Sequence, residues 1–252
     1  MAQGFRTKLL SLLALSTLSI SAQATGITVS AAASLTNAFQ DIAQRYEALH
    51  PDAKVELNFA ASGALLQQIA HGAPVDIFAS ADQATMDKAE QQGLIDPRTR
   101  HNFARNTLVL IVPADSHQNL LTLADLKKAD IQKIAIGNPA SVPVGHYTQD
   151  VLQAAHLWKA LTPKTINTQN VRQSLDYVAR GEVDAGFVYG TDTYIMKDRV
   201  KTAFEVPTKT PVTYPLAIPR DSVHADEAKR FLAFILAPEG QEILARYFFK
   251  KP

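Results

Sequence analysis

Hydrophobic and polar positions follow two alternating patterns through most of the chain. Short runs rich in β-branched and aromatic residues are typical of strands, and they alternate with longer segments whose apolar residues recur every three or four positions, as in amphipathic helices. The stripe formed by Leu35, Phe39, Ile42, Tyr46 and Leu49 is one such helix. This alternation predicts an α/β fold with mixed, mostly parallel sheets.

The pattern also gives approximate bounds for each element. We predict strands at 27–31, 54–59, 75–79, 105–113, 133–137, 164–167, 185–188 and 212–218, and helices at 35–49, 63–70, 145–155, 171–180 and 225–236, with one more beginning after an Asp82 cap. A second α/β set begins near residue 105, and the strand at 212–218 returns to the first. We therefore predict one lobe from residues 25–104 and about 206–252, and another from about 105–205.

A short internal echo bears on this division. Gly72-Ala-Pro-Val-Asp76 and Gly181-Glu-Val-Asp184 each place a helix-stopping glycine before Val-Asp and an apolar strand. The echo fits either duplicated architecture or coincidence.

The first 24 residues have the pattern of a secretory signal peptide. Arg6 and Lys8 precede an apolar run from Leu9 to Ile20, and Ala22-Gln-Ala24 forms a small-x-small cleavage site. The run is shorter than the about 20 residues that a membrane-spanning helix needs. We expect cleavage after Ala24 and a soluble periplasmic protein.

Charge and cysteine content narrow the possible functions. Without the two basic leader residues the chain has 23 Lys and Arg against 24 Asp and Glu, a balance that argues against nucleic acid as a partner. The chain contains no cysteine, so disulfides, thiolate metal sites and cysteine nucleophiles are excluded.

Two serines lie where a predicted strand gives way to a predicted helix. Ser34 follows three alanines and Ser62 follows two, and each stands at the start of a helix. Free backbone N–H groups and the helix dipole make such a position suitable for an anion, although an ordinary N-cap explains a single serine equally well. Two such strand-Ala-Ala-Ser-helix segments within about 30 residues favour an anion site.

The second half offers further candidates. Helices begin near Val144 and near Val171, and Gly145, which lacks a Cβ, would let the backbone approach a bound group. Tyr189 ends a predicted strand, where its hydroxyl could face a ligand crevice or its ring could be a half-buried edge aromatic.

Together these segments closely resemble the periplasmic molybdate-binding proteins of ABC importers, in order and over essentially the whole chain after the leader. The segments that carry the resemblance are Ala31-Ala-Ala-Ser34-Leu-Thr, Phe59-Ala-Ala-Ser62-Gly63, Pro74-Val-Asp76-Ile-Phe-Ala-Ser-Ala-Asp82, Gly137-Asn-Pro-Ala-Ser-Val-Pro-Val-Gly145, Asn170-Val171-Arg172 and Gly186-Phe-Val-Tyr189-Gly190-Thr-Asp192.

The resemblance implies a type II periplasmic binding protein, with two α/β lobes joined by two hinge strands. It implies an oxyanion held between the lobes by the hydroxyls and N–H groups of Ser34 and Ser62, the N–H groups of Val144 and Val171, and the Tyr189 hydroxyl. Val144 stands where a smaller alanine is more familiar in the family, a change that a backbone contact should tolerate. The molybdenum would be contacted only through its oxygens, with no direct metal ligand and no cofactor. A membrane permease is the implied protein partner, and we expect a monomer.

The residue types agree with that ligand. Molybdate near neutral pH offers only acceptors, whereas hydrogen phosphate also needs an acceptor, and none of the five positions is Asp or Glu. Tungstate should bind comparably. Sulfate or thiosulfate remains the alternative, because only cavity size separates sulfate from molybdate.

Two other classes of protein compete with a receptor. A serine-dependent hydrolase would also place serines at helix starts, but the chain lacks G-x-S-x-G, P-loop and H-E-x-x-H motifs. Among the histidines only His146 lies near a candidate segment, and we expect it to face solvent. A scaffold or adhesin is disfavoured because no repeats or low-complexity segments are present.

Overall fold

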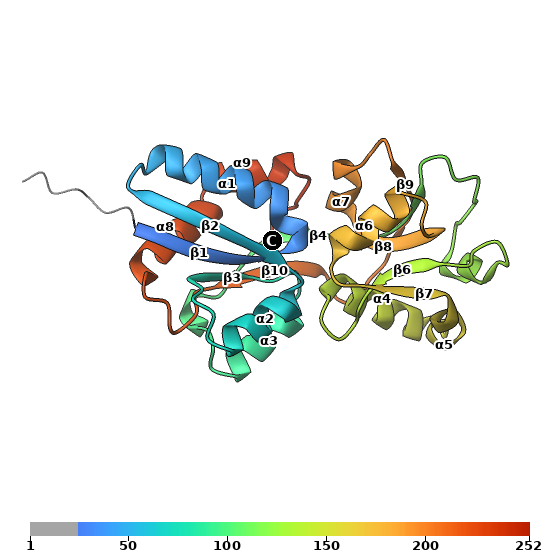
Figure 1. Cartoon of the computed structure of the whole chain (residues 1–252), viewed down its shortest axis with the longest axis horizontal. Helices are drawn as coiled ribbons and strands as arrows, with labels where there is room; N and C mark the ends of the chain where they lie inside the picture. The colour runs from blue at the N-terminus through green and yellow to red at the C-terminus, as the bar shows by residue number, and fades with distance from the viewer. Residues whose placement is uncertain (1–24) are drawn as a thin grey trace, which may run out of the picture.

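The computed structural model describes residues 25–252, so the predicted leader lies outside the described residues. Two α/β lobes lie side by side along the long axis of the molecule (Figure 1). Each lobe is built on one five-stranded sheet with helices on both faces. The predicted α/β class with mixed sheets is confirmed.

Lobe 1 contains a sheet in the order β2-β1-β3-β10-β4, in which the first three strands are parallel and β10 runs antiparallel to both of its neighbours. Helices α1, α8 and α9 cover one face, and α2 and α3 the other (Figure 1). The elements are β1 (Thr25–Ala32), α1 (Thr36–Leu49), β2 (Ala53–Ala60), α2 (Ser62–Ala70), β3 (Ile77–Ala79), α3 (Gln83–Gln91), β4 (His101–Asn106), β10 (Val212–Ala217), α8 (Ala225–Leu236) and α9 (Pro238–Arg246), with 3-10 turns η1 (Ala33–Leu35) and η2 (Pro97–Thr99).

Lobe 2 has a sheet in the order β7-β6-β8-β5-β9, with β6 parallel to β7 and β8 and with β5 antiparallel to β8 and β9. Its elements are β5 (Leu108–Pro113), η3 (Leu123–Lys127), β6 (Ile134–Gly137), α4 (Pro143–Ala154), α5 (Trp158–Leu161), η4 (Thr162–Lys164), β7 (Thr165–Thr168), α6 (Val171–Ala179), β8 (Ala185–Tyr189), α7 (Gly190–Ile195) and β9 (Val200–Val206).

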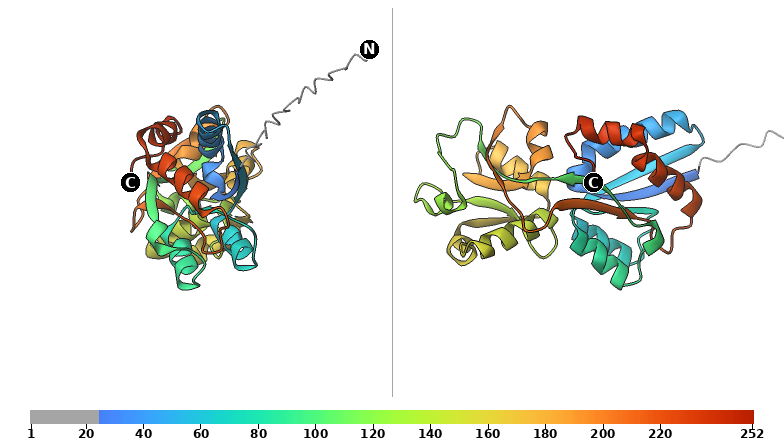
Figure 2. Two further views of the ribbon diagram at one scale, coloured as in Figure 1. Left: turned by 90° about the vertical axis from the view of Figure 1, so that its left-hand side faces the viewer. Right: turned by 180° about the vertical axis from the view of Figure 1, so that it is seen from behind.

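The chain crosses between the lobes twice. It passes from β4 into β5 through Thr107 and returns from β9 into β10, and Figure 2 shows both connections from behind. The change of sheet thus falls between residues 106 and 108 and again between 206 and 212.

The sequence echo corresponds to a structural one. Gly72 and Gly181 both adopt positive φ angles, 84° and 68°, and end the helices that precede β3 and β8, the middle strands of the two sheets. Asp76 accepts a hydrogen bond from the Thr28 N–H at 2.8 Å, and Asp184 accepts one from the Lys133 N–H at 2.8 Å. Each carboxylate therefore ties the segment before a middle strand to the neighbouring strand.

Some predicted elements were wrong in extent. The apolar run at 105–113 is not one strand, because Thr107 separates β4 of one sheet from β5 of the other. The sequence analysis also missed β9, an edge strand in which the exposed Lys201, Thr202 and Glu205 interrupt the apolar pattern. Within residues 25–252 no helix is long and apolar enough to cross a membrane.

Candidate functional site

A small hollow lies between the two lobes, and all five predicted ligand residues line it. Only about 10 Å³ of it can hold the centre of a water molecule, so the lobes leave little free space there. In the part of the chain that the structure describes, its lining contains no charged side chain. The lining residues are Ala32, Ala33, Ser34, Ala61, Ser62 and Ala81 from lobe 1, and Val142, Pro143, Val144, Asn170, Val171 and Tyr189 from lobe 2.

Ser34 and Ser62 both lie at the ends of parallel strands, where β1 and β2 lead into helical turns. Neither is an N-cap: Ser34 lies inside η1, whereas Ser62 is the first residue of α2 and follows Ala61 as the N-cap. The N-cap residues of η1 and α2 are alanines, so no side chain accepts a capping hydrogen bond at either helix start. The ordinary-cap interpretation is therefore wrong for both serines.

The hydroxyls of the two serines each have a defined partner within the protein. Ser62 Oγ accepts a hydrogen bond from the backbone N–H of Ala81 at 3.0 Å, and Ser34 Oγ lies 3.0 Å from the phenol oxygen of Tyr214. Both serines are buried, with 3% of Ser34 and none of Ser62 exposed. A backbone N–H and a phenol are not general bases, so this arrangement differs from that of a serine hydrolase.

Val144 and Val171 lie in the first turns of two lobe 2 helices. Pro143 is the first residue of α4, which makes Val144 the second, and Val171 is the first residue of α6. First-turn N–H groups have no partner within their own helix. Asn170 caps α6 in an extended conformation by accepting a hydrogen bond from the Gln173 N–H, which leaves the Val171 N–H available to the hollow.

Tyr189 ends β8 and is more deeply buried than expected. Only 1% of the residue is exposed, so the alternative of a half-buried edge aromatic is wrong. Its hydroxyl lies 3.4 Å from the Ala81 carbonyl oxygen across the hollow. Burial raises the pKa of Tyr189 well above its ordinary value, so the phenol keeps its proton and remains a donor.

Arg172, which the sequence analysis quoted but assigned no role, links the lobes beside the hollow. It donates to Asn37 Oδ1 at 2.8 Å and to the Ser34 carbonyl oxygen at 3.2 Å, both in lobe 1. Its Nε lies 2.8 Å from Asp192 Oδ1 in lobe 2, as an ion pair without hydrogen-bond alignment. Burial raises the pKa of Asp192 to about 6, and Arg172 opposes that rise. Asp192 thus offsets the charge of Arg172, so the guanidinium works as a directional contact between the lobes.

His146 makes a second contact between the lobes. Its ring Nδ1 lies 3.7 Å from Asp82 Oδ2, and its Nε2 lies 3.8 Å from Asp150 Oδ2. The Asp82 carboxylate raises the pKa of His146, and the Asp150 carboxylate adds to this, against the effect of burial. The prediction that His146 faces solvent is correct only in part: 42% of its side chain is exposed, but the ring also faces lobe 1.

Two glycines permit close packing. A Cβ on Gly145 would lie 1.8 Å from the Gly137 carbonyl oxygen, so this glycine lets α4 pack on β6, and it is not among the residues that line the hollow. A Cβ on Gly63 would lie 2.6 Å from the Ser141 carbonyl oxygen, to which the Gly63 N–H donates at 3.0 Å. Gly63 therefore brings the backbones of the two lobes together.

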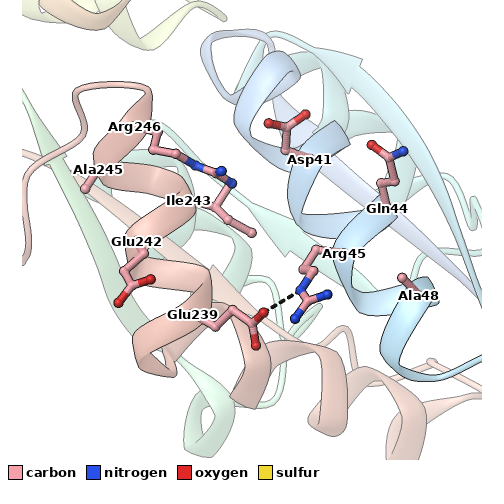
Figure 3. A pocket seen from close by; sticks show the side chains of 9 residues that line it. All are labelled: Asp41, Gln44, Arg45, Ala48, Glu239, Glu242, Ile243, Ala245 and Arg246. Carbon is pink, nitrogen blue, oxygen red and sulfur yellow. Dashed lines mark hydrogen bonds and ion pairs between the residues drawn. The ribbon is translucent and has the colours of Figure 1, made fainter.

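A larger surface groove, about 890 Å³, lies between α1 and α9 in lobe 1 (Figure 3). Asp41, Glu239 and Glu242 line it, and Arg45 forms an ion pair with Glu239 across it. Its three carboxylates outnumber its two arginines, Arg45 and Arg246, which disfavours an anion, and only one lobe contributes. The small hollow between the lobes is therefore the better candidate site.

Comparison with known proteins agrees with this architecture. Residues 27–250 match the family model described as bacterial extracellular solute-binding protein. The chain is 37% identical over 228 residues to the molybdate-binding protein ModA of Escherichia coli, covering 88% of each chain.

Solved structures of similar fold include two oxyanion-binding proteins. The periplasmic molybdate-binding protein of Azotobacter vinelandii matches with a TM-score of 0.77 and 22% identity, over 90% of this chain and 99% of that one. The sulfate-binding protein SubI of Mycobacterium tuberculosis matches with a TM-score of 0.78 and 17% identity, over 90% and 87% of the two chains. The predicted type II periplasmic binding protein fold is confirmed. The chain belongs to the bacterial extracellular solute-binding protein family.

Proposed function

We propose that this protein is a periplasmic receptor that binds molybdate or tungstate in the hollow between its lobes and delivers the anion to an ABC importer in the membrane. The observation that carries the proposal is the composition of the hollow. It combines two serines, two first-turn backbone N–H groups and one phenol, and its described lining contains no carboxylate. The identity to ModA of Escherichia coli supports the choice of anion.

The chemistry of the hollow suits a small anion that carries no proton. Molybdate presents four oxygens that only accept hydrogen bonds, and a pocket lined by hydroxyl and N–H donors satisfies them. The N-termini of α4 and α6 add the positive ends of two helix dipoles. The volume of about 10 Å³ is far below the about 300 Å³ or more that a drug-sized organic ligand needs.

Sulfate is the second candidate, favoured by one observation. The fold also matches the sulfate-binding protein SubI, and sulfate offers the same four acceptor oxygens. The two anions differ in size, so their relative affinity depends on the fit of the hollow. An ester substrate is disfavoured, because neither serine hydroxyl has a base as its partner.

The division of donors between the lobes suggests a binding order. The anion first contacts Ser34 and Ser62 in lobe 1, and closure then adds Val144, Val171 and Tyr189 from lobe 2. A ligand shifts this equilibrium only through its differential affinity for the closed state, so the lobe 2 contacts provide the signal that a permease senses. Arg172 and Gly63 add contacts between the lobes that favour the closed form.

Isothermal titration calorimetry with four anions tests the proposal. The monomeric protein, cleaved after Ala24, should bind molybdate and tungstate with comparable affinity, sulfate more weakly, and hydrogen phosphate weakest. Absence of heat with molybdate would reject the proposed function, and tighter binding of sulfate would reassign the ligand. Hydrolysis of phosphomonoesters or carboxylic esters that is lost on Ser34→Ala would favour an enzyme instead.

A further inference from the structure

Behind Ser34, two polar side chains, the buried Tyr214 and the half-buried Asn106, continue away from the hollow. The phenol oxygen of Tyr214 lies 3.0 Å from Ser34 Oγ, and the side-chain nitrogen of Asn106 lies 3.2 Å from that phenol oxygen. Tyr214 is completely buried. Ser34, Tyr214 and Asn106 thus form a continuous chain of hydrogen bonds from the hollow to the segment that joins the lobes.

The orientation of the Asn106 amide is fixed by its neighbours. Its Oδ1 accepts hydrogen bonds from the backbone N–H groups of Thr107 at 2.9 Å and Thr191 at 3.4 Å. The amide nitrogen therefore points the other way and donates its two hydrogens, one to Thr191 Oγ1 at 2.8 Å and one to Tyr214. Asn106 can only be a donor toward Tyr214.

This orientation sets the direction of the remaining hydrogen bonds. Tyr214 keeps its proton, because burial raises its pKa well above the ordinary value. Since its oxygen accepts from Asn106, its own hydrogen is directed at Ser34 Oγ, the other polar partner that the structure gives it within residues 25–252. Ser34 Oγ then accepts from Tyr214, and its hydrogen points into the hollow.

We propose that Asn106 and Tyr214 are positioning residues that make Ser34 a hydrogen-bond donor toward the ligand, and that they thereby select oxyanions carrying no proton over protonated ones. The inference rests on the proposed function and deepens it. Ser62 is also oriented as a donor, but by a different partner. Its oxygen accepts a hydrogen bond from the Ala81 backbone N–H, so its own hydrogen points away from Ala81 N.

The placement of these residues connects ligand selection with lobe closure. Asn106 is the last residue of β4 and Tyr214 lies on β10, so each residue belongs to a lobe 1 strand that adjoins one of the two chain crossings between the lobes. Asn106 also donates to Thr191 of lobe 2. The direction of the Ser34 hydroxyl is thus fixed by groups near the junction of the two lobes.

Asn106→Asp is the sharpest test, because it reverses the direction of the hydrogen bonds that link residue 106, Tyr214 and Ser34. A carboxylate only accepts, so the Tyr214 hydrogen turns toward residue 106, the Ser34 hydrogen turns toward Tyr214, and Ser34 presents a lone pair to the hollow. Calorimetry at pH 8 would compare molybdate with hydrogen phosphate, both dianions there. The ratio of the molybdate to the hydrogen phosphate association constant should fall by about tenfold or more.

Comparing two dianions separates the effect of the Ser34 hydrogen-bond direction from the effect of the added negative charge. Simple repulsion by the new carboxylate weakens both by the same factor, and an unchanged ratio would overturn the inference. Asn102→Asp, which adds a charge at an exposed position on the same strand, should leave the ratio unchanged. If the wild-type protein fails to bind molybdate, the proposed function is rejected. If it binds molybdate but Asn106→Asp leaves the ratio of the molybdate to the hydrogen phosphate association constant unchanged, only the positioning role of Asn106 and Tyr214 is rejected.

Tyr214→Phe provides a second variant that adds no charge. Loss of the phenol frees the Ser34 hydrogen to rotate, so molybdate affinity should fall by about fivefold to tenfold and the ratio to hydrogen phosphate should fall with it. Tyr46→Phe is the matched control, since Tyr46 is a buried tyrosine of lobe 1 whose hydroxyl donates to Glu227 outside the hollow. Equal molybdate affinity in the Tyr214 and Tyr46 variants would contradict the inference.

Discussion

Each lobe has a sheet in which three parallel strands are followed by a strand that runs antiparallel to both of its neighbours. The two lobes nevertheless offer different kinds of hydrogen-bond donor to the hollow between them. Lobe 1 presents the side-chain hydroxyls of Ser34 and Ser62, which follow β1 and β2. Lobe 2 presents backbone N–H groups at Val144 and Val171, at the starts of α4 and α6, together with the Tyr189 phenol. One architecture therefore serves two chemically different halves of a site.

The difference lies in what holds each donor in place. A helix fixes the direction of its first N–H groups, so the N–H groups of Val144 and Val171 need no supporting network to direct them. A serine hydroxyl rotates and both donates and accepts, so its direction must come from its partners. The Tyr214 phenol and the Ala81 N–H supply those partners in lobe 1. Side-chain substitutions should thus affect ligand binding mainly in lobe 1.

Ser62→Ala should have the largest effect among single truncations. It removes one donor to the anion and leaves the buried Ala81 N–H without its acceptor, so we expect affinity for molybdate to fall by about 10-fold to 100-fold. Ser30→Ala is the control, because Ser30 is equally buried on β1 but accepts from Asn58 outside the hollow. Calorimetry would measure both variants, and equal affinities would show that Ser62 does not contact the anion.

Val171→Pro tests the backbone donors of lobe 2. Proline is tolerated at the first position of a helix, and Asn170 before it is already extended, so the substitution removes the N–H with little change to α6. We expect about a tenfold loss of affinity for molybdate. Val171→Ala, which keeps the N–H, should bind within about twofold of the wild type. The reverse order would assign the contact to the side chain.

Tyr189→Phe removes the hydroxyl donor that lobe 2 contributes to the hollow. Because the ring keeps its packing in the buried site, the fold should be retained, while molybdate affinity falls by about threefold to tenfold. Circular dichroism melting would check the fold alongside the titration. An unchanged dissociation constant would remove Tyr189 from the ligand set.

His146→Gln should have the smallest effect, confined to the pH dependence of binding. The raised pKa of His146 means that its charged form is favoured by Asp82 across the lobe junction. This contribution to closure is complete below the ordinary value of 6.5 and is lost as pH rises through the raised pKa. Because the pair is partly exposed, molybdate affinity should fall only about twofold to fivefold between pH 6 and pH 8.5. The variant should lose the fall in affinity that His146 causes, and a slope equal to that of the wild type would place the titrating group elsewhere.

Local pattern was sufficient to predict much of the fold and the residues around the hollow. The helix at 225–236 was predicted with the bounds that α8 has, because its apolar stripe is uninterrupted. Ser34, Ser62, Val144, Val171 and Tyr189 each lie at a strand end or a helix start, which local pattern detects, and the structure brings all five together. Their contacts with an anion stay a prediction.

The residues that support the site could not be found in this way. Tyr214 lies 180 residues from Ser34 and has the sequence context of an ordinary buried strand residue. Asn106 has a role only because β4 ends beside Thr191 and Tyr214. Arg172 was visible as part of a motif, but its contacts with Asn37 and Ser34 depend on how the lobes close. Such roles arise from tertiary packing, on which single-sequence patterns carry no information.

A crystal structure of the protein with molybdate, measured at the molybdenum absorption edge, tests the central claim most directly. The account predicts one anomalous peak in the hollow, with the oxygens of the anion within hydrogen-bond distance of Ser34 Oγ, Ser62 Oγ, the N–H groups of Val144 and Val171, and the Tyr189 hydroxyl. A peak outside the hollow, or an anion in contact with a carboxylate, would contradict it.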